Sequence, residues 1–118
     1  MALFSCGSGS SGMESPSTQP TVTYTGTDGQ SYTKTIYFYK MGDLKIAKLA
    51  LDKVSDADSI DFLVNSLPSG YAPTSGTSYF TGISGNKAMR TGIITSTRIR
   101  LYGTTDTSGG MYATAVYV

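Results

Sequence analysis

The stretch Leu67-Pro68-Ser69-Gly70-Tyr71-Ala72-Pro73 interrupts the succession of short strands and turns that fills the rest of the chain. Its two prolines lack a backbone donor and have a fixed φ, while Gly70 between them can take a positive φ. Neither a helix nor a central strand continues through such a segment. We therefore expect an irregular crossing that divides two β-rich halves, with Tyr71 as a structural wedge rather than a ligand contact.

The composition on both sides of this crossing is that of an all-β protein. Aromatic residues make up 11% of the 118 residues and are mostly Tyr, and Thr, Ser and Gly are abundant, which favours strands joined by turns. Residues 1–20 are rich in Gly and Ser and hold little apolar surface, so we expect a flexible linker or tag there. Residues 21–118 are then a single β-sandwich domain of ordinary size.

Several classes of function are disfavoured by the residue types that are missing. The chain has no His and only one Cys, Cys6, which removes the usual general base, the imidazole metal ligand, internal disulfides and zinc clusters. We expect no cofactor and no metal. A net charge of +1 gives no strong positive electrostatic field that would attract nucleic acid. The apolar runs are too short for membrane insertion.

Charge is unevenly distributed along the chain. Every carboxylate lies at or before Asp61 except Asp106, whereas residues 62–105 carry four basic side chains and no acid. The cluster Asp52, Asp56, Asp58 and Asp61 could in principle hold calcium, but it lacks the Gly and the terminal Glu of an EF-type loop. We expect a solvated loop there.

Alternation and turn residues predict the strands. Asp28-Gly29 indicates a hairpin turn, after which Tyr37 and Tyr39 are expected in the core or between subunits. The segment 44–51 is interpreted as a strand with Leu44 and Ile46 inward and a bulge near Ala47-Lys48. Further along, the inward side chains are Ile60, Phe62, Val64, Ile99 and Leu101. The expected strands are 21–26, 31–39, 44–51, 59–64, 78–83, 87–95, 98–102 and 111–118.

Three segments together resemble a known group of domains. They are Tyr39-Lys40-Met41-Gly42-Asp43, the crossing 67–73, and Thr91-Gly92-Ile93-Ile94-Thr95-Ser96 leading into 98–102. The pattern resembles the C-terminal head domains of bacteriophage tail fibre, baseplate and receptor-binding proteins, of the type found in siphophages of Gram-positive hosts. The family pattern often has Arg where Ala72 stands and Gly where Thr97 stands, so an Arg-dependent contact near the crossing cannot be carried over.

The resemblance implies an antiparallel jelly-roll-like β-sandwich in which the crossing passes between sheets. It implies a homotrimer that belongs to the distal phage tail or baseplate and is not catalytic. Such a head attaches the virion to a host cell-surface polysaccharide or a teichoic-acid-like glycan, and its N-terminal side joins other tail or baseplate proteins.

The candidate saccharide-binding residues lie in the basic part of the chain. Arg98, Arg100 and Tyr102 are expected outward on one strand face, where guanidinium groups can pair with oxyanions and Tyr can lie against a sugar ring. An ordinary solvated strand face explains the same pattern. Folding of the hairpins beside one another would add a second set: Tyr79, Asn86, Lys87, Arg90 and Asp106.

Two other functions remain open at this point. A structural tail-fibre module would use its surface to bind another virion protein. A glycan hydrolase would need paired carboxylates, and Asp56, Asp58 and Asp61 offer the only concentration of them. Carboxylates in a short solvated loop would have similar pKa values, which does not suit that chemistry.

Overall fold

The computed structural model describes residues 12–54, 59–103 and 109–118, which contain nine strands and no helix. The all-β class is therefore confirmed. No helix among these residues is long and apolar enough to span a bilayer. The strands are β1 (Thr21–Thr25), β2 (Ser31–Thr35), β3 (Tyr37–Met41), β4 (Leu44–Leu51), β5 (Ile60–Phe62), β6 (Thr77–Ile83), β7 (Met89–Thr95), β8 (Ile99–Leu101) and β9 (Met111–Tyr117).

Seven of these strands form one antiparallel sheet in the order β3-β4-β9-β6-β7-β8-β5, and β1 and β2 form a separate hairpin. The last strand, β9, lies between β4 and β6. The chain is β-rich on both sides of the 67–73 crossing, as expected, but the crossing joins two strands of one sheet, so the expectation that it passes between sheets was wrong. The crossing joins β5, at one edge of the sheet, to β6 in its interior.

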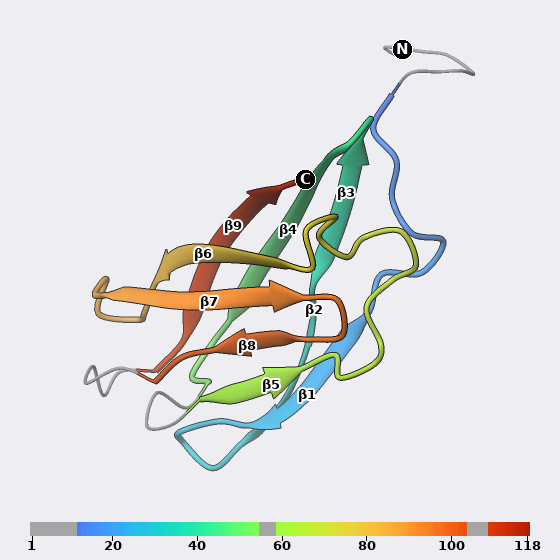
Figure 1. Ribbon diagram of the computed structural model, residues 1–118. Helices are drawn as coiled ribbons and strands as arrows, with labels where there is room; N and C mark the ends of the chain where they lie inside the picture. The colour runs from blue at the N-terminus through green and yellow to red at the C-terminus, as the bar shows by residue number, and fades with distance from the viewer. Residues whose placement is uncertain (1–11, 55–58, 104–108) are drawn as a thin grey trace.

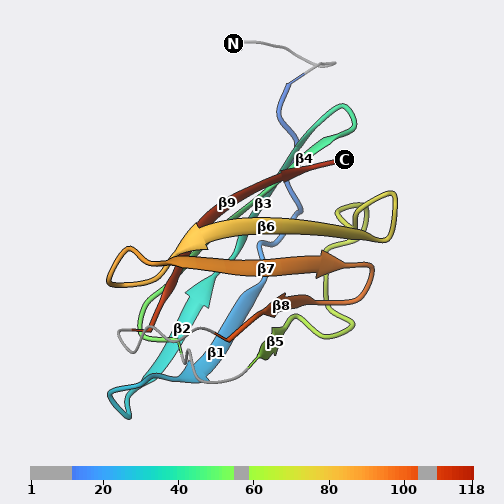
Figure 2. The same ribbon diagram turned by 60° about the vertical axis from the view of Figure 1, so that its left-hand side comes forward.

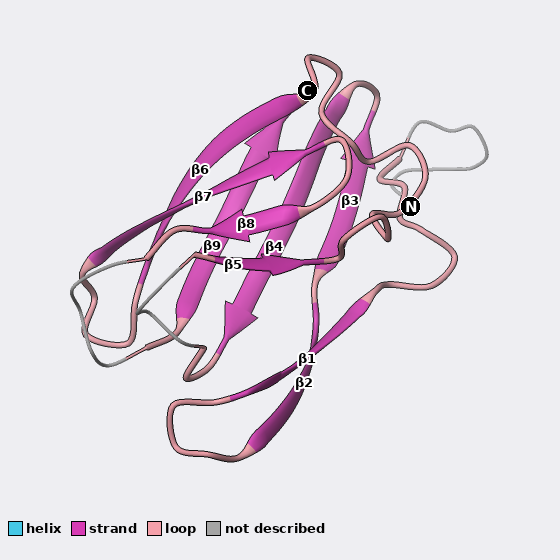
Figure 3. Ribbon diagram, turned by 60° about the horizontal axis from the view of Figure 1, so that its bottom comes forward, coloured by secondary structure: helices cyan, strands magenta, loops and turns pink. Residues whose placement is uncertain are grey.

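The sheet curls so that its two ends face each other as the layers of a sandwich. In Figure 1 the layer β3-β4-β9 lies behind the layer β6-β7-β8-β5, and Figure 3 shows the strands of the two layers crossing. The corner lies where β9 meets β6, through a single register pair, Ile83 with Tyr112. At this corner a Cβ on Gly82 would lie 2.4 Å from the Tyr112 carbonyl oxygen and 2.6 Å from the Ala113 Cβ.

The core fills the space between the two layers and the hairpin. Because side chains alternate along a strand, each layer contributes every second residue. Ile99 and Leu101 are fully buried, as the alternation predicts. The largest contributors are Phe38, Leu49, Leu51 and Tyr117 from one layer, Phe62, Phe80, Ile94, Ile99 and Leu101 from the other, and Val22 and Tyr24 from the hairpin.

The hairpin β1-β2 turns at Asp28-Gly29, as the sequence predicts. The Asp28 carboxylate accepts hydrogen bonds from the Gln30 amide and the Tyr32 hydroxyl. The expected long second arm, 31–39, is divided at the buried Ile36 into β2 and β3, which belong to different sheets. Figure 2 shows β2 running on into β3 across this division.

Strand β4 contains no bulge, which corrects the expected structure of 44–51. Its register with β3 and β9 is continuous, so Lys45 shares the inward face with Ala47, Leu49 and Leu51. Lys45 is buried and its Nζ donates to the Thr74 hydroxyl at 3.2 Å. A long side chain whose ammonium finds an oxygen partner makes the inward position tolerable, so the regular strand needs no bulge.

The inward assignments of Leu44, Ile46 and Val64 are also wrong, since Leu44 and Ile46 lie on the outward face of β4. β5 ends at Phe62, and Leu63 has a positive φ of 54°, so Leu63 is buried and Val64 is exposed. Tyr37 and Tyr39 lie on the outer face of β3 rather than in the core, with their rings stacked at 6.4 Å between centroids. Phe38 between them takes the inward position, so the core alternative is wrong for both tyrosines, and their place between subunits stays a prediction.

The crossing 67–73 is irregular, as its prolines and glycine predict. Gly70 has a φ of 86°, and the buried Tyr71 packs edge-on against Phe38. The Tyr117 hydroxyl donates to the Tyr71 carbonyl at 2.9 Å, and Lys40 Nζ lies 5.0 Å from the Tyr71 ring centroid. Tyr71 therefore has the structural role that the sequence predicts for it.

The N-terminal segment covers the free edge of β3. Glu14 exchanges two backbone hydrogen bonds with Lys40, and the Gln19 side chain exchanges two with the Phe38 backbone. The Pro20 carbonyl accepts from the Ile36 amide. The folded unit therefore extends from Thr21 back to Glu14, and the backbone groups of an edge strand that could pair with another chain are occupied.

We predict that Gly82→Ala destabilises the protein by about 1–3 kcal/mol, because the added methyl group overpacks the β6–β9 corner. Chemical denaturation followed by circular dichroism measures the change. Gly12→Ala is the matched control, since nothing lies within 4 Å of its Cβ position. Equal free energies of unfolding for Gly82→Ala and Gly12→Ala would contradict the conclusion that the β6–β9 corner requires glycine.

Candidate functional site

The outer face of the layer β6-β7-β8-β5 carries most of the residues that the sequence analysis proposed. The strand register aligns one outward residue from each strand: Tyr79 with Ile93, Ile93 with Arg100, and Arg100 with Asp61. Tyr79 is 73% exposed. The four side chains form a row across the sheet, which we call the Tyr79–Asp61 row.

One carboxylate at the end of this row binds two guanidinium groups. Arg100 Nε donates to Asp61 Oδ1 at 2.7 Å and its Nη2 to Oδ2 at 3.1 Å, and Arg98 Nη1 donates to Oδ2 at 3.0 Å. The hydrogen bonds from Arg100, and then those from Arg98, hold the pKa of Asp61 below its usual range. The cluster keeps one net positive charge, and Asp61 fixes the positions of both Arg side chains.

A shallow depression of about 230 Å³ lies beside this cluster. Its lining combines the Arg98 and Arg100 side chains with the Tyr102 ring, and Ile93 and Thr95 complete it. Such a surface can hold an oxyanion through guanidinium donors and a flat sugar ring against tyrosine. The arginines are already paired, so a ligand has to share them with Asp61.

The remaining candidate residues do not join this depression. Asn86 and Lys87 lie in the turn after β6, next to the Ile83–Met89 pair, whereas Arg98 follows the other end of β7. Arg90 points into the core, where it is 1% exposed, and its Nη1 donates to the Gly110 carbonyl at 2.8 Å. We therefore correct the assignment of Arg90, which is structural. Asp106 lies outside the described residues.

The sequence analysis assigned Asp61 to a solvated acidic loop, whereas it lies in β5 opposite Arg100. Its neighbours Ile60 and Phe62 were assigned inward, which already puts Asp61 on the outward face. The missing information was that β5 pairs with β8, because that pairing alone sets Asp61 opposite Arg100.

The acidic segment does not form a single cluster in the part of the chain that is described. Asp52 accepts hydrogen bonds from the Tyr112 hydroxyl and from Lys34 Nζ, away from Asp61. Asp56 and Asp58 lie outside the described residues. Among the described residues, no three His, Cys, Asp or Glu side chains are grouped so that they could hold a metal ion.

The chain matches no protein-family model, no curated protein and no solved structure. Its function must therefore be inferred from the geometry and the residues themselves.

We predict that Asp61→Asn lowers the free energy of unfolding by about 0.5–1 kcal/mol at pH 7, the range of partly exposed ion pairs. A carboxyl group whose pKa is lowered in the folded state stabilises the fold above its unfolded pKa of about 3.9. That stabilisation disappears as pH falls through the folded pKa, so the difference between variant and wild type should shrink below about pH 4. Urea unfolding at several pH values measures it.

The control is Asp43→Asn, since Asp43 is exposed and has no ion pair within the described residues. A stability difference for Asp61→Asn that stays constant from pH 7 to pH 2 would rule out the ion pairs as its cause.

Proposed function

We propose that this domain is a non-catalytic receptor-binding head of a phage tail fibre or baseplate, which attaches the virion to saccharides on the bacterial surface. The observation that carries the proposal is the Tyr79–Asp61 row, in which an exposed tyrosine shares one sheet face with Arg100, and Asp61 holds both Arg100 and the neighbouring Arg98 in position. The family resemblance and its jelly-roll-like fold are part of the proposal.

The chemistry of the row fits a glycan with phosphate or carboxylate groups, such as a cell-surface polysaccharide or a teichoic-acid-like polymer. Within the described residues, Arg100 uses only its Nε and Nη2 on Asp61, so Nη1 is available to an oxyanion. Tyr79 and Tyr102 offer ring faces to sugars, as amphipathic aromatic side chains do. Holding the arginines in place beforehand lowers the entropy cost of binding.

Hydrolysis of the glycan is the weaker proposal. A glycosidase of the usual kind needs one carboxyl group with a raised pKa as the acid and a second carboxylate nearby. Asp61 has a lowered pKa and its oxygens are occupied by two guanidinium groups. This environment suits a residue that positions arginines.

The outer face of the other layer carries an apolar patch that supports contact between copies of the chain, and the trimeric number comes from the family resemblance. Met41, Leu44, Val116 and Val118 are each between 41% and 60% exposed there, and the register places Met41 beside Leu44. Exposed apolar patches of this kind mark protein–protein contacts. We define the apolar patch as these four residues with Ile46, and propose that copies of the chain pack through it.

The same apolar patch favours a second candidate function, a structural tail-fibre module that binds another virion protein. The two functions differ in what the Tyr79–Asp61 row does, because a structural module has no need for a saccharide. In both cases, we propose that the N-terminal side joins the domain to other tail or baseplate proteins.

We predict that replacing both Arg98 and Arg100 by Gln reduces binding to bacterial surface glycans at least about tenfold. A hydrogen bond to a charged group contributes about 1.5–3 kcal/mol, and 1.4 kcal/mol corresponds to a factor of ten. An array of wall polysaccharides and teichoic acids measures binding. Lys87→Gln is the control, because it removes a positive charge that lies outside the depression.

Undiminished binding by the double variant would rule out the Arg pair as the site. Binding by neither protein would favour the structural module. Release of reducing ends from the polysaccharide by the wild type would instead establish a hydrolase.

We predict a solution mass about three times the chain mass of 12.4 kDa, measured by light scattering after size exclusion. Val116→Glu should shift the protein towards the monomer, because it places charge in the apolar patch. Thr81→Glu, at an exposed position of the other layer, should leave the mass unchanged. A monomeric wild type would contradict the trimer.

A further inference from the structure

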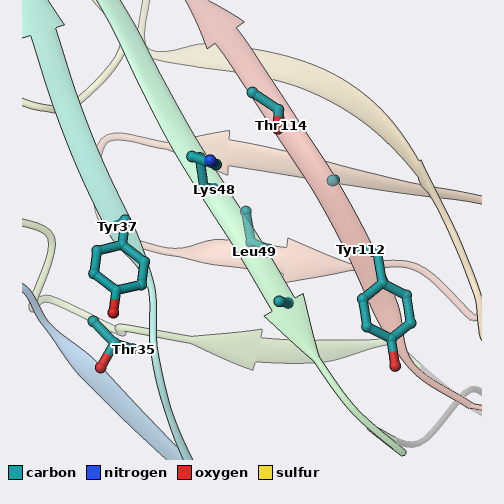
Figure 4. Close-up of a pocket in the computed structure, with 8 residues that line it drawn as sticks. Thr35, Tyr37, Lys48, Leu49, Tyr112 and Thr114 are labelled. Carbon is teal, nitrogen blue, oxygen red and sulfur yellow. The ribbon is translucent and has the colours of Figure 1, made fainter.

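A second concave site lies on the outer face of β3, β4 and β9, opposite the Tyr79–Asp61 row. It is a groove of about 500 Å³, within the size range of small-ligand sites. Figure 4 shows Tyr37 on β3 and Tyr112 on β9 at either side of β4. The register explains the arrangement, since Lys48 pairs with both Tyr37 and Thr114, and Ala50 pairs with Tyr112.

The groove exists because a small side chain stands between two large ones. Ala50 projects outward from β4 between the positions of the two tyrosines. Because its side chain is only a methyl group, the surface of β4 at the bottom of the groove is lower than the tyrosine rings on either side. Any larger residue at position 50 would fill this space. A flat ring of one monosaccharide can enter such a groove and contact tyrosine on its less polar face.

Both tyrosine rings are held in place by neighbouring side chains. Tyr37 stacks on Tyr39 with an angle of 4° between the ring planes. The Tyr112 hydroxyl donates to Asp52, whose other carboxylate oxygen binds Lys34 Nζ at 2.9 Å. Walls that are already ordered before a ligand arrives lose little entropy on binding.

The charge in the groove differs from that in the depression on the other layer. Within the described residues, no carboxylate lies within ion-pair distance of Lys48, whereas Arg98 and Arg100 both bind Asp61. The hydroxyl groups of Thr35 and Thr114 also line the groove. An exposed ammonium that has no ion pair in the described part of the chain, beside two hydroxyl groups, complements a ligand that carries an anionic group and further hydroxyls.

We propose that this groove binds a single six-membered sugar ring that carries a carboxylate or phosphate group. The ring lies between Tyr37 and Tyr112, and the anionic group pairs with Lys48. The expectation of a sugar rests on the proposed saccharide-binding function; the location and the anionic group follow from the groove. Because Lys48 and Ala50 lie further along β4 than Leu44 and Ile46, the groove is distinct from the apolar patch.

Nuclear magnetic resonance titration of the full chain tests the proposal. The probes are methyl α-D-glucuronide, the neutral methyl α-D-glucoside, and inorganic phosphate as an anion without a ring. We expect the glucuronide to shift the ring resonances of Tyr37 and Tyr112 more strongly than the glucoside at equal concentration. Phosphate alone should leave these rings unshifted, because it makes no stacking contact.

Two variants separate the parts of the proposal. Lys48→Gln should weaken glucuronide binding about two- to fivefold, the effect of losing one exposed ion pair, and should leave glucoside binding unchanged. Ala50→Leu should abolish both by filling the floor. Lys87→Gln is the charge control on the other layer, and a thermal unfolding curve verifies that each variant is folded.

The proposal is overturned if the glucuronide shifts neither tyrosine ring, or if the shifts persist in Ala50→Leu. Equal shifts from phosphate and glucuronide would also overturn it, since they would show a simple anion contact. The two tests are independent of each other. The glycan array with the Arg98 and Arg100 double variant tests the proposed site on the other layer. The shifts of the Tyr37 and Tyr112 ring resonances test the groove.

Discussion

The close approach of β6 to β9 at Gly82 is the constraint on which the rest of the structure depends. One continuous sheet can form two facing layers only if it turns sharply somewhere, and the single register pair at this corner marks the turn. The backbone and Ala113 side chain of β9 occupy the volume where a Cβ of residue 82 would lie. The absence of a side chain there lets the sheet fold over its own apolar face.

Folding one sheet on itself leaves two outer faces, and their chemistry differs because their neighbours differ. At β8, Arg98 and Arg100 meet Asp61 from β5, which compensates one of their two positive charges and fixes their positions. On β4, outward Lys48 meets Tyr37 and Thr114, neither of which can neutralise it. The domain thereby presents a paired cationic surface on one side and, on the other, an ammonium group between aromatic rings that has no ion pair among the described residues.

Polar side chains, both buried and partly exposed, connect elements that the sheet alone does not join. Arg90 reaches the carbonyl groups of Tyr102 and Gly110 across the layer. Asp52 links Lys34 of the hairpin to Tyr112 of β9, and burial together with the Asp52 carboxylate raises the pKa of Tyr24 to about 12. The buried cations Lys45 and Arg90 and the buried hydroxyl groups of Tyr24 and Tyr117 each donate to an oxygen, which is the condition for tolerating them in a core.

The sequence by itself determined which segments are strands and, in the clearest cases, which side chains face inward. Alternation at Ile99 and Leu101, the Asp28-Gly29 turn and the irregular 67–73 crossing follow from properties of a few adjacent residues. Only the tertiary structure decided that β9 lies between β4 and β6, that Asp61 meets Arg100, and that Lys45 and Arg90 point inward. The reason is physical: a two-residue period sets the faces of a strand locally, whereas strand partners and oxygen acceptors for buried cations come from residues far away in the chain.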